Sequence, residues 1–248
     1  MTEPAIRQII STARHLLLDF DGPVCSIFAG TGAQAVAAQL RDTLLTAGFA
    51  LPALAMNSGD PLEVFRLAAT VSTDAALAAQ QLLTAFEIRA VPTATPTRGS
   101  ADLIVTAARS GRTVTIVSNN SGAAIAAYLA DHHLTRHIHA IVARDDQHPE
   151  RMKPEPYRVR EALGILDADN TQCAMIGDST SDVFAGQLAG VPVIGYASKP
   201  GKAQALADAL AAAVTTDLAE ITVVLRAVSS SGRGDRRPPC GAGAGTDS

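Results

Sequence analysis

Acidic side chains follow the first apolar run of this chain at a spacing that could support chemistry. The run 15–18 leads into Asp19 and Asp21, and the turn residues Gly22 and Pro23 come next. Two carboxylates two residues apart share one face of a continuing strand. They repel each other unless a cation lies between them or one of them holds a proton. The stretch therefore predicts a cation-binding or proton-transfer site at the end of a buried strand.

Polar groups recur at the ends of two later apolar runs. Ser118 and Asn119 follow one of these runs, Asp178 and Asp182 follow another, and Lys153 lies between them. Each group taken alone is better explained as a helix cap, a polar loop or a solvated surface charge. In open α/β sheets, however, ligands bind beyond the carboxyl ends of the strands. The combination predicts that all these side chains belong to one site.

The elements that must position these residues alternate along the chain. Predicted helices cover 101–110, 123–132, 156–164 and 182–189, and predicted strands cover 112–117, 138–143, 172–176 and 191–196. Strands alternating with helices indicate βαβ units and a parallel sheet covered by helices on both faces. We therefore expect the α/β class, with a Rossmann-like parallel sheet as the core.

A helical segment separates the first strand from this alternating part. Residues 32–91 are rich in Ala and Leu at helical spacing, and Asp60 followed by Pro61 is typical of a helix start. The segment 92–97 has the composition of a linker. We predict a core domain of residues 1–23 and 96–228, an inserted helical cap domain of residues 24–95, and a disordered tail at 229–248, which is poor in apolar residues.

Composition limits the classes of partner. The formal net charge is −4, which argues against broad nucleic-acid binding and against attraction to an anionic membrane. No apolar stretch approaches the roughly 18 residues of a membrane span. The three cysteines are scattered and indicate no disulfide framework. We expect a cytoplasmic protein without nucleic-acid or membrane partners, and the sequence indicates no oligomeric state.

Taken together, the segments resemble the four motifs of the haloacid dehalogenase (HAD) superfamily. These are DFDG at 19–22, Ser118 after an apolar strand, Lys153 followed by proline, and GDSTSD at 177–182. The helical insertion resembles the C1-type cap of phosphoglycolate phosphatase-like members. The resemblance implies the HAD fold and a Mg²⁺-dependent phosphatase that hydrolyses a small phosphorylated metabolite through an aspartyl-phosphate.

The resemblance also implies roles for the acidic residues. Asp19 would be the nucleophile, and Asp21 would protonate the leaving group and then activate water. Mg²⁺ is a hard cation that takes oxygen ligands. Asp19, the backbone carbonyl of Asp21, and Asp178 would hold it, and Asp182 would orient this set from outside the coordination sphere.

The remaining motif residues would bind the substrate. By resemblance, Ser118 and Asn119 would contact the phosphoryl group, and Lys153 would balance charge and hold Asp19 in place. One position departs from the family pattern, because Pro23 stands where a threonine is usual. The change removes a hydroxyl and a backbone N–H but no metal ligand and no nucleophile.

Other classes of enzyme that act on phosphate or halide substrates would need residues that this sequence lacks or arranges differently. The chain has no P-loop pattern, and no cysteine is followed by Arg at the spacing of a cysteine phosphatase. Within the superfamily that these motifs resemble, a dehalogenase would lack an aspartate at the position of Asp21. A phosphonatase would need a lysine in the cap, and residues 24–95 contain none. A sugar phosphomutase of the same superfamily, or a non-catalytic regulatory protein on this scaffold, stays open.

The charge balance of the cap bears on the substrate. Its basic residues are Arg41, Arg66 and Arg89, and its acidic residues are Asp42, Asp60, Glu63, Asp74 and Glu87. Arg66 lies three residues after Glu63, within reach of a helical ion pair. Binding a second phosphate dianion needs several convergent donors. We therefore expect a small monophosphate as the substrate, rather than a sugar bisphosphate.

Overall fold

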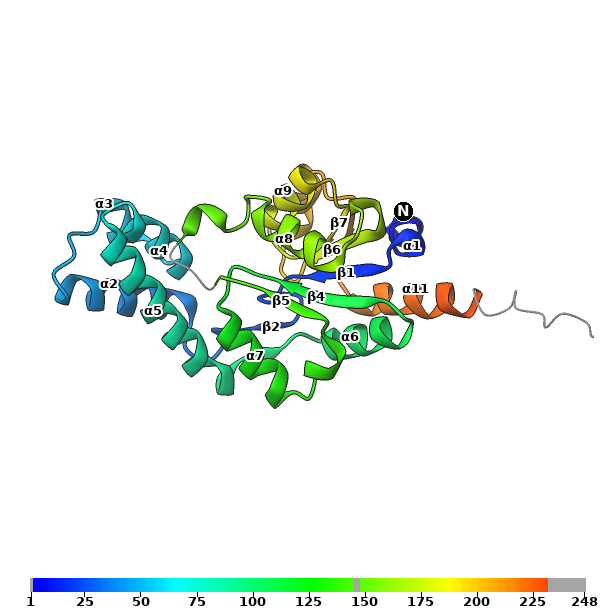
Figure 1. Cartoon of the computed structure of the whole chain (residues 1–248), viewed down its shortest axis with the longest axis horizontal. Helices are drawn as coiled ribbons and strands as arrows, with labels where there is room; N and C mark the ends of the chain where they lie inside the picture. The colour runs from blue at the N-terminus through cyan, green and yellow to red at the C-terminus, as the bar shows by residue number, and fades with distance from the viewer. Residues whose placement is uncertain (1, 145–147, 232–248) are drawn as a thin grey trace, which may run out of the picture.

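A six-stranded parallel sheet forms the centre of the molecule (Figure 1), in the order β5-β4-β1-β6-β7-β8. The strands are β1 (His15–Leu18), β4 (Thr113–Val117), β5 (Ala140–Val142), β6 (Cys173–Gly177), β7 (Val193–Tyr196) and β8 (Ala213–Thr215). The structure is a computed structural model, and it describes residues 2–144 and 148–231. β1 pairs in parallel with both β4 and β6. The residues that follow these three neighbouring strands are therefore brought to one edge of the sheet.

Helices cover both faces of the sheet. One face carries α1 (Thr2–Thr12), α6 (Ser100–Arg109), α7 (Gly122–Asp131) and α11 (Leu218–Ser231), and the other carries α8 (Tyr157–Leu166), α9 (Thr180–Ala189) and α10 (Lys202–Asp208). Side chains of β1 alternate between the two faces of the sheet, because successive strand residues point to opposite sides. Leu16 and Leu18 join the core under the first layer, and Leu17 joins the core under the second. β1 is consequently buried on both sides.

Four α-helices lie between β2 (Cys25–Ser26) and β3 (Thr95–Pro96) and form the inserted cap. They are α2 (Ala33–Thr46), α3 (Ala53–Asn57), α4 (Pro61–Ala69) and α5 (Thr73–Ala90). They share an apolar cluster that includes Leu40, Phe65 and Leu83, and Met152 of the core also packs into it. Asp60 caps α4 as predicted, since its Oδ1 accepts a hydrogen bond from the Leu62 N–H at 2.9 Å. The expected α/β class, parallel sheet and inserted helical cap are confirmed.

The two connections between cap and core pair with each other. β2 (Cys25–Ser26) and β3 (Thr95–Pro96) form a short antiparallel ladder, so part of the predicted linker 92–97 is a strand. The Thr97 hydroxyl also donates to the Gly22 carbonyl at 2.5 Å. A single-sequence pattern did not indicate this pairing because each strand has only two residues. The ladder lies where the predicted domain boundaries fall, and the boundaries themselves remain predictions.

The end of the described chain differs from expectation. α10, β8 and α11 follow the last predicted strand, in a region for which no element was predicted. α11 continues through Ser231, so residues 229–231 are helical and do not begin a tail. The Ser229 hydroxyl donates to the Leu225 carbonyl within this helix at 2.7 Å. The rest of the predicted tail, 232–248, lies outside the described residues.

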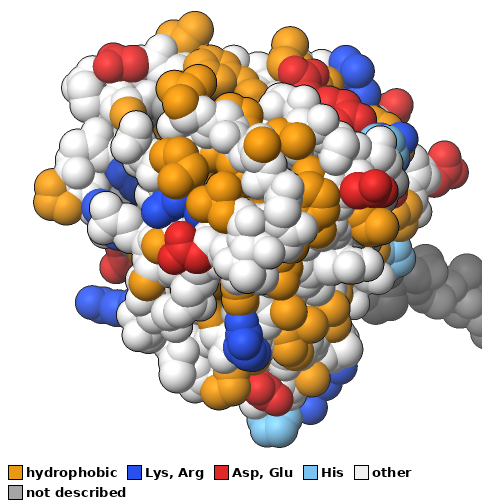
Figure 2. All heavy atoms as spheres, turned by 90° about the vertical axis from the view of Figure 1, so that its left-hand side faces the viewer, with side chains coloured by type: hydrophobic (Ala, Val, Ile, Leu, Met, Phe, Trp, Pro, Cys, Tyr) orange, Lys and Arg blue, Asp and Glu red, His pale blue; other side chains and the backbone are white. Residues whose placement is uncertain are grey.

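Four short 3-10 helices connect the main elements: η1 (Val91–Thr93), η2 (Thr135–His137), η3 (Pro149–Arg151) and η4 (Asn170–Gln172). Within residues 2–144 and 148–231, no helix has the length and apolar character needed to cross a membrane. At the cap end of the molecule, shown in Figure 2, apolar side chains lie scattered between acidic and basic ones. Leu54 and Met56 are among the exposed apolar residues of the cap.

We expect Leu17→Ala to lower the free energy of unfolding by about 2–5 kcal/mol, because it empties a fully buried position between sheet and helices. Leu54→Ala is the matched control. Its side chain is 73% exposed, so its loss should change stability by no more than about 0.5 kcal/mol. Urea unfolding of both variants measures the difference. Equal losses would show that β1 does not lie in the core.

Candidate active site

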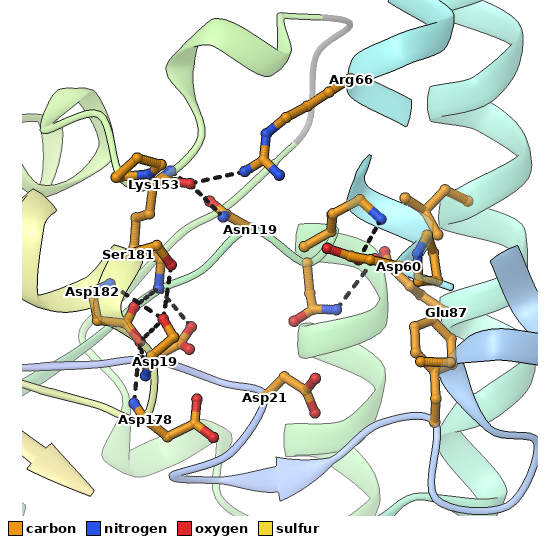
Figure 3. A pocket seen from close by; sticks show the side chains of 18 residues that line it. Asp19, Asp21, Asp60, Arg66, Glu87, Asn119, Lys153, Asp178, Ser181 and Asp182 are labelled. Carbon is orange, nitrogen blue, oxygen red and sulfur yellow. Dashed lines mark hydrogen bonds and ion pairs between the residues drawn. The ribbon is translucent and has the colours of Figure 1, made fainter. Parts of the chain in front are cut away.

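A cavity of about 400 Å³ lies between the carboxyl edge of the sheet and cap helices α4 and α5 (Figure 3). Six of the residues predicted from the sequence line it: Asp19, Asp21, Asn119, Lys153, Asp178 and Asp182. They come from the segments after β1, β4 and β6 and from the loop before α8. Ser118 is the exception, because it is buried and does not line the cavity.

Lys153 is the central cation of this site. Its Nζ lies 2.7 Å from Asp19 Oδ1 and 2.6 Å from Asp182 Oδ1, and it donates to the Val117 carbonyl at 2.9 Å. The side chain is only 2% exposed. Burial alone would lower the pKa of Lys153, but the two carboxylates outweigh it and raise the pKa to about 12. Lys153 is therefore charged at neutral pH and ties three loops together.

Asp19 belongs to a cluster of three carboxylates. Ligand atoms of Asp19, Asp178 and Asp182 all lie within 4.8 Å of one another. Burial raises the pKa of Asp19 to about 7, and Asp182 adds to this effect while Lys153 opposes it. Burial also raises the pKa of Asp178. Carboxylates crowded in this way are stabilised by a hard cation, so the donor set fits a metal such as Mg²⁺.

Glycine at position 22 is required for this cluster to form. Gly22 has φ +114°, which L side chains rarely adopt, and a Cβ placed there would lie 2.3 Å from Asp178 Cγ. The DG pair of the first motif thus lets the loop after β1 approach the loop after β6.

Asp182 braces the loop that carries Asp178. Its Oδ2 accepts hydrogen bonds from the backbone N–H groups of Asp178 and Ser179, at 3.1 and 3.0 Å, and from the Ser179 hydroxyl at 2.6 Å. Ser179 in turn caps α9, so the two residues form a capping box. With Oδ2 engaged in this way and Oδ1 facing Lys153, Asp182 can orient the cluster without ligating a metal.

Asp21 does not pair with Asp19 as the strand spacing suggested. β1 ends at Leu18, and the chain then turns, with the Val24 N–H donating to the Phe20 carbonyl at 3.0 Å. The turn directs Asp21 elsewhere, and its Oδ1 accepts from the Ile27 N–H at 3.0 Å. The surrounding protein atoms displace water from the carboxyl and raise the pKa of Asp21 to about 6, although the residue is exposed toward the cavity and that hydrogen bond opposes the shift. The repulsion expected between the two motif aspartates instead involves Asp19 and Asp182.

The segment after β4 is held by its own polar groups. Ser118 Oγ donates to Asn120 Oδ1 at 3.2 Å. Asn119 is fixed against the lysine loop, because its Oδ1 accepts from the Lys153 N–H at 2.9 Å and its Nδ2 donates to the Lys153 carbonyl at 3.1 Å. Asn119 therefore sets the position of Lys153, and the Ser118 hydroxyl would have to turn from Asn120 to reach a ligand.

A buried ion pair that the sequence did not indicate joins the cap to this segment. Arg144 Nη2 lies 2.8 Å from both carboxylate oxygens of Glu87, on α5, and the two side chains are 0% and 1% exposed. Glu87 also accepts from the Ser121 N–H at 2.8 Å, and Arg144 Nε donates to the Asn119 carbonyl at 2.9 Å. The pair thereby fixes the loop after β4. These residues are 57 positions apart, so no local pattern could have found them.

Two other cations near the site were also missed. Lys202, at the start of α10, pairs with Asp178 Oδ2. Arg66, on α4, lines the cavity and donates from Nη2 to the Lys153 carbonyl at 3.0 Å. The ion pair expected between Arg66 and Glu63 is not formed, because Glu63 instead accepts from the Ser58 hydroxyl at 2.7 Å.

The amino-acid sequence of this chain is similar to those of known hydrolases. Residues 53–196 match the family model described as haloacid dehalogenase-like hydrolase. The plasmid-encoded phosphoglycolate phosphatase of Cupriavidus necator is 38% identical over 106 residues. This match covers 41% of the present chain and spans 45% of that relative's length.

Solved structures of low sequence identity share the fold. A protein from Clostridium acetobutylicum, described as a predicted phosphatase, is 17% identical with a TM-score of 0.67, over 87% of this chain and 99% of its own. The L-2-haloacid dehalogenase of Xanthobacter autotrophicus is 14% identical with a TM-score of 0.58, over 86% of this chain and 98% of its own. The fold is thus shared by one protein described as a predicted phosphatase and another described as a dehalogenase.

We expect Arg144→Met to destabilise the protein by about 3–5 kcal/mol, because it leaves the Glu87 carboxylate buried without its cation. The double variant Arg144→Met/Glu87→Gln removes both charges and should recover part of this loss in urea unfolding. Arg226→Met is the control. It breaks an exposed pair with Asp102 and should cost about 1 kcal/mol or less. A loss for Arg144→Met no larger than that of the control would contradict a buried ion pair.

Proposed function

Because this chain belongs to the haloacid dehalogenase-like hydrolase family, we propose that it is a phosphomonoesterase in which Asp19 becomes transiently phosphorylated. One observation carries the proposal. Asp19 is buried against the ammonium of Lys153 at 2.7 Å and lines the same cavity as Asp21. This arrangement supplies a held nucleophile, a separate proton donor and positive charge in one cavity.

In the first half-reaction, an oxygen of Asp19 attacks phosphorus and the bond to the leaving alkoxide breaks. Asp21 gives its proton to that alkoxide. The raised pKa of Asp21, about 6, suits this role, because a good acid–base group titrates near the working pH. Lys153 keeps Asp19 in place and offsets the negative charge that gathers on the phosphoryl oxygens.

In the second half-reaction, Asp21 removes a proton from water, which attacks the phosphorus of the aspartyl-phosphate. The bond between phosphorus and Asp19 breaks, and inorganic phosphate and the free carboxylate are released. The proton that Asp21 gave to the alkoxide is thereby replaced. The residue returns to its starting state without any external base.

We propose Mg²⁺ as the cofactor. Asp19, the backbone carbonyl of Asp21, and Asp178 would hold it, and Asp182 would orient them. Bound Mg²⁺ would neutralise charge on the transferring phosphoryl group. Asn119 would hold the backbone of Lys153 in position. The Ser118 hydroxyl would contact the phosphoryl group once it no longer donates its hydrogen bond to Asn120.

We propose a small phosphomonoester as the substrate. The cavity, at about 400 Å³, is near the lower limit of ligand sites. The name of the Cupriavidus relative makes phosphoglycolate the first compound to test.

A halide needs no proton when it leaves, so the general acid Asp21 favours phosphate ester hydrolysis over the dehalogenase reaction. A sugar phosphomutase stays the alternative. It would have to hold a second phosphate, and the cavity offers few cations for one.

We expect Asp19→Asn to lower kcat by roughly 10³-fold or more, because the amide cannot form the covalent intermediate. Asp102→Asn makes the same chemical change at an exposed ion pair and should leave turnover unchanged. Phosphate release from an aryl phosphate measures both, with circular dichroism to verify folding. Turnover by the Asp19→Asn variant close to that of the unaltered protein would rule out this nucleophile.

We expect Asp178→Ala to raise the Mg²⁺ concentration for half-maximal activity by about tenfold or more, because it removes an anionic ligand. Ser118→Ala removes only a hydroxyl and should leave that concentration within about twofold. Magnesium titrations of the two variants give the comparison. Similar midpoints would mean that the proposed ligand set is wrong.

A further inference from the structure

The wall of the cavity opposite the carboxylate cluster contains a cation, Arg66, that has no acidic partner among the residues that the structure describes. Of the described residues that line the cavity, two are basic, Lys153 and Arg66. Lys153 is neutralised by Asp19 and Asp182. Arg66 forms no ion pair within residues 2–144 and 148–231, and its one hydrogen bond there is to the Lys153 carbonyl at 3.0 Å. Because that carbonyl is neutral, no carboxylate among the described residues balances the charge of the guanidinium.

The cap directs this cation into the cavity. Arg66 lies one helical turn after Leu62 on α4, and both side chains line the cavity because residues four apart share a helix face. Neighbouring Phe65 lies in the cap core. Figure 3 shows the Arg66 guanidinium beside the Lys153 carbonyl, at the opposite end of the view from Asp178. A guanidinium has five donors, so Arg66 retains N–H groups for a ligand.

Lys153 lies between Asp19 and Arg66 and contacts both of them. Its ammonium contacts Asp19, and its carbonyl contacts Arg66. A phosphoryl group at Asp19 and an anion at Arg66 would therefore be separated by about the length of one lysine residue. Met152, which packs into the cap cluster, and Asn119, which bonds to the same carbonyl at 3.1 Å, fix that spacing.

On the basis of the proposed phosphomonoesterase function, we propose that Arg66 binds a carboxylate of the substrate, so that the preferred substrates are small phosphorylated acids. The guanidinium fork matches a carboxylate in shape and charge. One unpaired cation can balance a single negative charge, whereas a second phosphate would bring two into a cavity that Asp60 and Glu87 also line.

The test compares 2-phosphoglycolate with ethyl phosphate, which has the same two carbons but no carboxylate. We expect Arg66→Met to reduce the ratio of their kcat/KM values by about tenfold to hundredfold, the value of one charge-assisted interaction. Arg89→Met is the matched control, because Arg89 is an exposed cap arginine that stacks on Phe86 at 4.7 Å, and it should leave the ratio unchanged. A ratio unaltered by Arg66→Met would overturn the proposal and assign Arg66 to support of the lysine loop or to the phosphoryl group.

A binding measurement separates this inference from the proposed function. Calorimetry on the Asp19→Asn protein gives the Kd of each compound without turnover. Adding Arg66→Met should weaken binding of 2-phosphoglycolate at least about tenfold more than binding of ethyl phosphate. If the unaltered protein hydrolyses neither compound, the phosphomonoesterase function fails, and this comparison still decides the carboxylate site. Equal weakening of both compounds, or binding of neither, contradicts the site.

Discussion

The buried ammonium of Lys153 between Asp19 and Asp182 is the interaction on which the site depends. A lysine that is 2% exposed stays charged only because two carboxylates offset the cost of burial. The same contact keeps the carboxylates close, although burial and mutual repulsion raise the pKa of Asp19 to about 7. Removing Lys153 would leave two carboxylates buried together without a cation, and removing either aspartate would leave the ammonium with one counter-charge. The cluster thus acts as one unit, and it joins the ends of β1, β4 and β6.

The cap is connected to this cluster by an apolar contact, a hydrogen bond and a buried ion pair. Met152, next to the lysine, packs into the apolar core of the cap, and Arg66 bonds to the lysine carbonyl. Glu87 and Arg144 form a buried ion pair that holds the loop after β4. A cap held by apolar contacts alone could shift over the core with little effect on the carboxylates. Here the buried polar contacts couple the position of the cap to the position of Lys153.

Local patterns in the sequence predicted five of the six strands of the central sheet and six of the residues that line the cavity. They succeeded for residues such as Asp178, which directly follows an apolar strand. They failed where the geometry depends on a turn or on distant partners. Asp21 is directed away from Asp19 by the turn that begins at Phe20. The partners of Arg66 and Arg144 lie tens of residues away, and helical spacing suggested only local ion pairs.

The central claim is that Asp19 carries the phosphoryl group during turnover. Borohydride reduces an acyl phosphate to an alcohol, so a phosphorylated aspartate becomes homoserine. The direct test is to acid-quench the protein during turnover with Mg²⁺ and a phosphomonoester, reduce it, and map its peptides by mass spectrometry. The proposed mechanism predicts homoserine at position 19, and none in a sample without substrate. An unmodified Asp19 during active turnover, or modification at Asp21 instead, would contradict it.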